Sequence, residues 1–437
     1  MVDPWFVLPP KPIGDGPDYE AIGYGLSRGY GWCTSFSDKD WRSVYENAHH
    51  AGVGLNYSVQ LARFGPITPD TNRPPFLPFC IAVVYQLVPR GPIAFGIIRI
   101  LLASCLSIGC AIAVAWGVAI AKRMSHAGSF FETSVGIAMI AIVYSERNLR
   151  NYATDFLTEP LALALTQAFL FIVWYGVQRG SLKWAALSGL LFAGMYYCRS
   201  IFVLWAPLVT LWLWCAYRVS LPSVGTRRLP AVYWVFVSTL VFVLFSSPWW
   251  IRNCYVLGSF HPLGTKGSTT LLGGYCEEAL KSGGEWQFAP EKELRRIEEA
   301  SHDLKKSTAQ EIIDIELEVG RQANIQVKLW IAQNLSLMPQ LMLQRAITEW
   351  NPYRGKALLL KLLALAGVVW LALYNRVALL WLLGPLAINT SIVICTYSVG
   401  GRFLVPTYGC LYILAAIGFA GGWQYIVDWS RFRFKAA

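Results

Sequence analysis

The sequence has little charge. Only 14% of its 437 residues are Asp, Glu, Lys or Arg, whereas 55% are hydrophobic. Soluble domains carry about 25% charged residues, so this composition excludes an ordinary soluble protein and indicates an integral membrane protein. The sequence also lacks a Walker loop, a Rossmann fingerprint, a His-rich metal motif and any zinc-site spacing. A nucleotide-dependent reaction is therefore unsupported, and no secretory signal peptide is visible.

Long apolar runs supply the membrane spans. A bilayer crossing needs roughly 17 to 25 apolar residues, and about nine stretches of the chain meet this length. They are Ile93–Ala121, Ser129–Ser145, Thr158–Val177, Lys183–Cys198, Ile201–Tyr217, Pro230–Trp250, Lys356–Tyr374, Val377–Thr396 and Leu404–Gly422. A further run, Pro74–Val88, is too short to cross, and its leading prolines favour an interfacial helix. The predicted class is an all-α polytopic membrane protein.

Basic residues alternate regularly between the spans. They lie at Lys122, Arg123, Arg179, Lys183, Arg218, Arg227, Arg228, Arg376, Arg431, Arg433 and Lys435. The positive-inside rule makes these loops cytoplasmic. The outer regions are then 1–92, 146–157 and 251–355, and they hold nearly all the carboxylates. The net charge of +11 therefore reports topology and not nucleic-acid binding.

Four regions follow from this topology. Residues 1–92 form an extracytoplasmic N-terminal loop with an acidic motif and the interfacial helix. Residues 93–250 hold transmembrane helices and the short outer loop, 251–355 form a large outer loop, and 356–437 hold the last spans and a short cytoplasmic tail. Within the large loop, 291–328 is charged and amphipathic, which predicts surface helices.

The acidic motif is Gly14-Asp15-Gly16-Pro17-Asp18-Tyr19. Gly and Pro predict a loop here, and a carboxylate fixed at a membrane surface is a natural general base, although solvated turn acids have the same pattern. Glu159 stands at the mouth of a span, where an ionisable group is kept for function or is favoured by the helix dipole. Arg199, Arg252 and Arg402 mark outer span ends, where basic residues also serve as interfacial anchors.

Three of the ten cysteines, Cys33, Cys254 and Cys276, lie in outer loops, where disulfides persist. A Cys254–Cys276 bridge is one pairing, but three cysteines do not pair evenly.

An ordered series of short motifs carries a family resemblance. Asp15-x-x-x-Tyr19 is followed by Arg73-Pro-Pro, Thr158-Glu159-Pro160, Pro248-Trp-x-x-Arg252-Asn253 and Gly401-Arg402-Phe403-x-x-Pro406. This series resembles membrane glycosyltransferases of the GT-C fold, in the family 39 and protein-mannosyltransferase-like group, to which the lipid A aminoarabinose transferase is related. The resemblance covers nearly the whole chain except the interior of 251–355.

The resemblance implies inverting transfer of a sugar from a polyprenyl-phosphate donor to a lipid, glycan or protein acceptor on the outer face of the membrane. It implies Asp15 as the catalytic carboxylate, with Asp18 and Tyr19 nearby, and Glu159 as a second active-site carboxylate. Arg73 matches the family's basic residue that faces the lipid phosphate. Further substrate-binding candidates are Arg199, Arg252, Asn253 and Arg402. No cofactor is expected, and the expected location is a bacterial inner membrane, with an endoplasmic-reticulum membrane as the equivalent alternative.

Three features depart from the family pattern. Family members usually have a span before the first outer loop, whereas Met1 lies only about 14 residues before Asp15. Asn72 stands where the aminoarabinose relative has an acid implicated in metal binding, so the sequence does not support a divalent metal and leaves it open. Gly16 follows Asp15 where a second acid is common, which leaves Asp18 as an alternative base.

Two other functions stay open at this point. A lipid or sugar transporter without chemistry would show charged or broken helices at the bilayer midplane and internal repeats, and no such repeat is visible. An inactive homologue that lacks the first span is the second alternative.

Overall fold

The chain is almost wholly helical. The computed structural model describes residues 4–12, 14–34, 36–52, 55–63, 65–124, 129–220, 230–300, 307–351 and 355–436, so Arg227 and Arg228 lie outside the described residues. Within these ranges the only sheet pairs two short antiparallel strands, β1 (Cys33–Thr34) and β2 (Thr68–Pro69). The predicted all-α class is confirmed.

Helices lie at each of the predicted spans. They are α5 (Pro92–Lys122), α6 (Ser129–Ser145), α8 (Glu159–Arg179), α9 (Leu182–Cys198), α10 (Ala206–Val219), α11 (Ala231–Leu257), α17 (Gly355–Tyr374), α18 (Arg376–Cys395) and α19 (Tyr408–Ala436). In the described part of the chain, 7 helical segments are long and apolar enough to cross a membrane, against about nine expected. The two other predicted spans are α6 and α9, whose 17 residues each put them at the short limit of the length that crosses a bilayer. The seven segments indicate an integral membrane protein.

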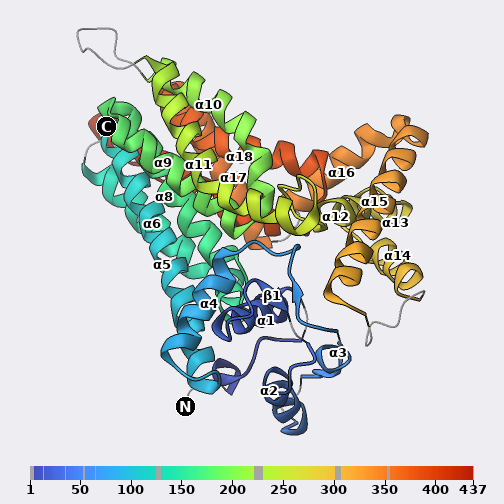
Figure 1. Cartoon of the computed structure of the whole chain (residues 1–437). Coiled ribbons are helices and arrows are strands. Elements are labelled where there is room, and N and C mark those ends of the chain that lie inside the picture. The colour runs from blue at the N-terminus through green and yellow to red at the C-terminus, as the bar shows by residue number, and fades with distance from the viewer. Residues whose placement is uncertain are drawn as a thin grey trace.

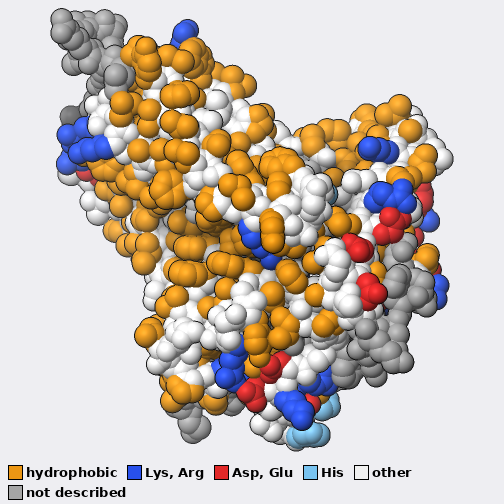
Figure 2. Space-filling view, viewed as in Figure 1, with side chains coloured by type: hydrophobic (Ala, Val, Ile, Leu, Met, Phe, Trp, Pro, Cys, Tyr) orange, Lys and Arg blue, Asp and Glu red, His pale blue; other side chains and the backbone are white. Residues whose placement is uncertain are grey.

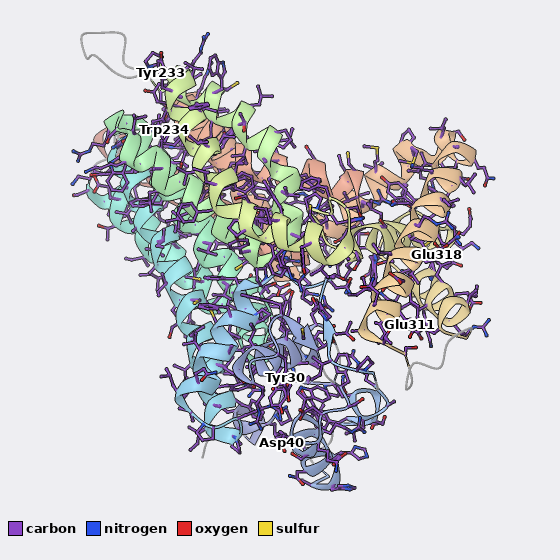
Figure 3. The ribbon with its side chains drawn as sticks, viewed as in Figure 1. Tyr30, Asp40, Tyr233, Trp234, Glu311 and Glu318 are labelled. Atoms are coloured by element: carbon purple, nitrogen blue, oxygen red, sulfur yellow. The ribbon has the colours of Figure 1, made fainter. Side chains whose placement is uncertain are left out.

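These helices form one bundle (Figure 1). Helix α8 packs between α5 and α9, α9 packs on α11, and α17 lies along α19. The interior is aromatic: Trp116, Trp234 and Trp381 are fully buried. Large apolar side chains also cover much of the outer surface of the bundle (Figure 2). At the start of α11, for example, Tyr233 faces outward and the next residue, Trp234, faces the core (Figure 3).

Several helix ends gather at one end of the bundle. They are the last residues of α5, α8, α10 and α19 and the first residues of α6, α9 and α11, at the upper left of Figure 1. Helices α1 (Gly16–Ser27) and α2 (Lys39–His50) lie toward the opposite end. Lys and Arg side chains cluster at the first end (Figure 2). This arrangement is the one expected when basic loops share one side of a membrane.

The predicted loop at 14–19 is wrong, because helix α1 begins at Gly16. Asp15 occupies the N-cap position, Pro17 lies in the first turn, and Asp18 is an acid in that turn. Each of these is a helix-start signal. Gly and Pro are also common in turns, which is why the same residues predict a loop. The predicted interfacial run is also helical, as α4 (Phe76–Leu87), and it packs along α1.

The N-terminal region has a core of its own. Trp41, Tyr45 and Tyr57 are fully buried and pack with residues of α1, α4 and α5. Its remaining short elements are η1 (Pro4–Val7) and α3 (Ser58–Leu61). The predicted short outer loop contains α7 (Arg147–Thr154).

The predicted large outer loop is a helical unit. Its elements are α12 (Lys266–Gly274), α13 (Glu277–Lys281), α14 (Ala289–Ala300), α15 (Ala309–Gln333), η3 (Leu335–Leu337) and α16 (Met338–Trp350). The predicted surface helices are therefore present as α14 and α15. Helix α15 begins with a capping box between Thr308 and Glu311, and Glu311 is exposed (Figure 3). One face of α15 is buried, however, through Val319 and Ala323, so this segment is more than a solvated surface.

The Cys254–Cys276 bridge is absent, since both cysteines are free. Cys276 caps the start of α13, where its sulfur accepts a hydrogen bond from Ala279 N at 3.4 Å.

Helices α17 and α19 cross at glycines. A Cβ on Gly418 would overlap the carbonyl oxygen of Leu363, whereas a Cβ on Gly422, one turn further along α19, would meet nothing within 4 Å. Close crossings at small residues are typical of membrane helices. We expect Gly418→Ala to lower the free energy of unfolding by about 1–3 kcal/mol, because the helices must separate.

Thermal unfolding in detergent checks this expectation, with Gly422→Ala as the matched control. Equal unfolding midpoints for the two variants would contradict the packing argument.

Candidate functional site

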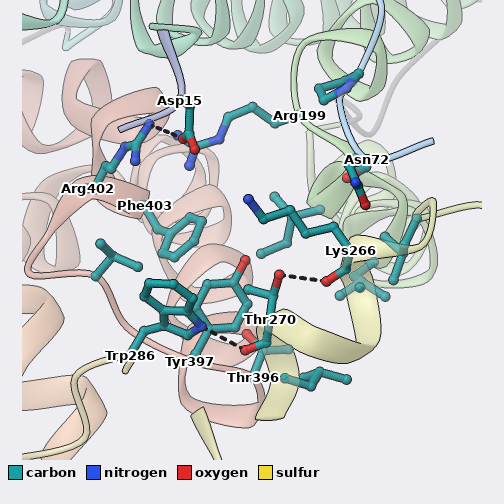
Figure 4. Close-up of a pocket in the computed structure, with 18 of the residues that line it drawn as sticks. Asp15, Asn72, Arg199, Lys266, Thr270, Trp286, Thr396, Tyr397, Arg402 and Phe403 are labelled. Carbon is teal, nitrogen blue, oxygen red and sulfur yellow. Dashed lines mark hydrogen bonds and ion pairs between the residues drawn. The ribbon is translucent and has the colours of Figure 1, made fainter. Parts of the chain in front are cut away.

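A cavity of about 530 Å³ lies where the N-terminal region, the end of the bundle and the large outer loop meet (Figure 4). Its volume is within the usual range of small-molecule sites. Its polar lining residues include Asp15, Tyr19, Asn72, Arg73, Arg199, Lys266, Thr270, Tyr397 and Arg402. Apolar residues complete the wall and include Pro74, Ile201, Leu204, Leu263, Leu271 and Phe403. Five of the nine residues singled out in the sequence therefore share one cavity.

Asp15 is held between two arginines. Arg73 Nη1 lies 2.8 Å from Asp15 Oδ1, and Arg402 Nη2 donates to Asp15 Oδ2 at 3.1 Å. Burial raises the pKa of Asp15, but the charges of Arg73, Arg402 and Lys266 outweigh burial and hold this pKa well below its usual range. Asp15 is therefore an ionised carboxylate on the cavity wall.

Tyr19 lies one turn further along α1. The guanidinium of Arg73 lies over its ring, 5.5 Å from the ring centroid. Burial raises the pKa of the Tyr19 hydroxyl well above its usual value, so this group stays protonated and can donate a hydrogen bond into the cavity.

Asp18 lies beside the cavity and is absent from its lining. Its carboxylate accepts from Arg73 Nη2 at 2.5 Å and also from Arg63. Burial raises the pKa of Asp18, but Arg73 and Arg63 outweigh it and bring the pKa to about 2. The structure thus gives Asp18 the position of a residue that orients Arg73.

Glu159 is also set back from the cavity. It is fully buried as the first residue of α8, where the helix dipole favours a carboxylate. Its Oε1 accepts from Arg199 Nη1 at 3.2 Å and from Arg402 Nε. Glu159 therefore links two arginines that do line the cavity.

Arg199 follows α9 and reaches the cavity, as Figure 4 shows. Its guanidinium lies over the ring of Phe403, 4.9 Å from the ring centroid.

Arg252 and Asn253 do not reach the cavity lining. Arg252 Nη1 donates to Asn253 Oδ1 at 3.0 Å, and its Nη2 donates to the carbonyl of Trp32 at 3.2 Å. Its guanidinium also lies 4.9 Å from the ring centroid of Trp249. These contacts tie the end of α11 to the N-terminal region. The two residues therefore join parts of the fold and do not line the cavity.

Lys266 lines the cavity, although no motif in the sequence marks it as a site residue. It is the first residue of α12, and its side chain extends into the cavity toward the side where Asp15 and Arg199 lie (Figure 4). Burial and the charge of Arg73 lower its pKa, although Asp15 and Asp18 act in the opposite direction. The available signal was a lone lysine between Gly264 and Gly267 soon after a span.

Hydrogen bonds hold Lys266 next to Arg73. Thr265 N donates to the carbonyl of Thr71 at 3.1 Å, and Thr265 Oγ1 donates to Asn72 Oδ1 at 2.5 Å. On the other side, Asp70 Oδ1 accepts from the backbone N–H of Arg73 at 2.7 Å. Two segments almost two hundred residues apart thereby place their cations on one wall.

The turn that carries Arg402 depends on Glu349 of α16. Glu349 Oε2 accepts from Ser398 Oγ at 2.8 Å and from Gly401 N at 3.4 Å, and its Oε1 accepts from Leu404 N at 3.0 Å. The two backbone donors flank Arg402, so a buried carboxylate fixes the backbone at this arginine.

No group of three or more His, Cys, Asp or Glu residues suited to a metal ion occurs among the described residues. Asn72, the position that replaces an acid of the family pattern, is engaged by Thr265. Comparisons of the chain with protein-family models, curated proteins and solved structures found no match.

Asp18 gives a prediction on acid stability. Its pKa is about 2 in the folded chain against an ordinary 3.8, so its contribution is complete above the ordinary value and is lost as the pH falls toward 2. We expect wild type to lose about 2 kcal/mol more of its free energy of unfolding than Asp18→Asn between about pH 5 and pH 2.

Thermal unfolding midpoints in detergent across this pH range provide the measurement. Asp40→Asn is the control, because Asp40 pairs with Arg28 on the exposed surface. Parallel pH profiles for wild type and Asp18→Asn would show that the ion pairs do not stabilise the fold.

Proposed function

We propose that this chain is a membrane glycosyltransferase that moves a sugar from a polyprenyl-phosphate donor to a hydroxyl of a lipid, glycan or protein acceptor, with inversion at the sugar carbon. The observation that carries the proposal is one cavity lined by an ionised carboxylate, Asp15, and by four cations, Arg73, Arg199, Lys266 and Arg402. The ordered motifs described above lead to the same reaction.

The cations suit a phosphate leaving group. Glu159 and Asp18 lie behind the wall and offset part of the charge, but Lys266 makes no ion pair with any described residue. The cavity therefore has an excess of positive charge, and arginine and lysine are the residues that bind phosphate oxygens. As the bond from the sugar carbon to the phosphate oxygen breaks, these charges stabilise the electron pair left on that oxygen.

Asp15 suits the role of general base. A carboxylate within about 3 Å of the acceptor hydroxyl takes its proton as the hydroxyl oxygen attacks the sugar carbon. Arg73 and Arg402 make Asp15 weakly basic in the unliganded cavity, since they hold its pKa low. A donor phosphate bound by the same arginines weakens their attraction for Asp15, so the carboxylate becomes more basic when the substrate is present.

The apolar wall suits a lipid-linked substrate. Ile201 and Leu204 belong to the helical segment Ser200–Val219, which is apolar and long enough to cross a membrane. A polyprenyl tail can remain in the bilayer beside this segment while its phosphate enters the cavity. By the positive-inside rule, the cavity end of the bundle lies outside the cytoplasm. A bacterial inner membrane agrees with this orientation, and an endoplasmic-reticulum membrane is the equivalent alternative.

Sugar transfer in membranes tests the proposal. Labelled polyprenyl-phosphate sugars are supplied to membranes that contain wild type, Asp15→Asn or the surface control Asp40→Asn at equal expression. We expect transfer by wild type and by Asp40→Asn, and a loss of about 10²- to 10⁴-fold in Asp15→Asn, as for removal of a general base.

Other outcomes assign the chemistry differently. Transfer that survives in Asp15→Asn but collapses in Asp18→Asn or Glu159→Gln would move the base to that residue. Movement of the lipid-linked sugar across vesicles without any product would establish a transporter instead. If a full panel of donors gives no transfer and no movement, the chain is an inactive homologue.

A further inference from the structure

Helix α16 buries its charged side chains and exposes apolar ones. Its two charged side chains point into the protein: Arg345 is 0% exposed and Glu349 is 1% exposed. Two of its large apolar side chains point outward, with Leu343 63% exposed and Ile347 38% exposed, whereas Leu341 is buried. A helix at a water-exposed surface shows the opposite arrangement.

Both inward side chains are hydrogen-bonded to the protein. Arg345 Nη1 donates to the carbonyl of Ile394 at 2.9 Å, and its Nη2 donates to the carbonyl of Gly274 at 2.8 Å. Glu349 accepts the three hydrogen bonds of the turn at Arg402. The orientation of α16 is therefore fixed by specific bonds, and its apolar residues are turned outward by the same geometry.

The outward residues form a continuous apolar stripe. Leu335 of η3 is 66% exposed, and Pro339, Leu343 and Ile347 follow at intervals of four residues, which places them on one side of a helix. None of the exposed residues of η3 and α16 carries a charge. By contrast, Glu293 and Arg296 form an exposed ion pair on α14 of the same outer unit. The stripe thus differs from the water-facing surface beside it.

The stripe continues into a candidate membrane span. Helix α16 lies between α15 and the bundle (Figure 1), and α17 begins at Gly355, soon after α16 ends. Lys361 Nζ of α17 donates to the carbonyl of Asn351 at 2.8 Å, which joins the ends of the two helices. The first turns of α17 expose Leu358 and Leu359. Hydrophobic side chains also cover the outer end of this unit, at the upper right of Figure 2.

We propose that the stripe formed by Leu335, Pro339, Leu343 and Ile347 lies in the lipid layer, at the boundary between headgroups and acyl chains, of the membrane that α17 crosses. Apolar residues of an interfacial helix are buried at this depth. The large outer unit is then anchored to the membrane by α16 as well as by its two flanking spans. This inference is independent of the proposed sugar transfer.

Photolabelling by lipid tests the inference on the wild-type chain. The full chain is placed in nanodiscs with a phospholipid that carries a diazirine on its acyl chain, and adducts are located by mass spectrometry after irradiation. We expect adducts on the segment 335–347 and on α17, and none around Ile297, which is a comparably exposed apolar residue (54%) on the charged helix α14.

A substitution pair provides an independent measurement. We expect Leu343→Glu to lower the lipid adducts on 335–347 at least about threefold, because a charge at this depth is disfavoured, and Ile297→Glu to leave them unchanged. Adducts on α17 without adducts on 335–347 would overturn the inference and place the stripe in water.

Discussion

The candidate site depends on a set of shared arginines. Arg73 bridges Asp15 and Asp18, and Arg402 bridges Asp15 and Glu159. Burying any one of these charges alone would cost several kcal/mol, so each segment that brings a carboxylate also requires the segment that brings its arginine. The start of α1, the segment before α4, the start of α8 and the turn before α19 are thereby held together, although they are separated in the sequence by up to almost four hundred residues.

The sequence predicted the features that depend on local composition. Apolar runs located the helices of the bundle because span length and hydropathy are properties of a single segment. The span number was less certain, since α6 and α9 have apolar sequences but only 17 residues. The sequence predicts a loop at the start of α1 because Gly16 and Pro17 favour turns and helix starts alike. Only the tertiary contacts of α1 distinguish the two.

The sequence points to candidate site residues more readily than to the role of each one. Asp15 and Asp18 belong to one short motif and both contact Arg73, yet Asp15 lines the cavity and Asp18 does not. Lys266 had no motif of its own, and its position follows from the contact of Thr265 with the 71–72 segment. Long-range pairing of this kind leaves no periodic pattern in a single sequence.

Helix α16 connects the surrounding medium to the site. In water the exposed Leu343 and Ile347 would favour rotation of the helix. Rotation would, however, expose Arg345 and Glu349 and break the bonds that hold the turn at Arg402. In lipid the same orientation of α16 serves its apolar and its charged side chains, because the apolar side chains face the acyl layer and the charges face the protein. The membrane would then act on the site through one carboxylate, Glu349, whose two backbone bonds flank the arginine that contacts both Asp15 and Glu159.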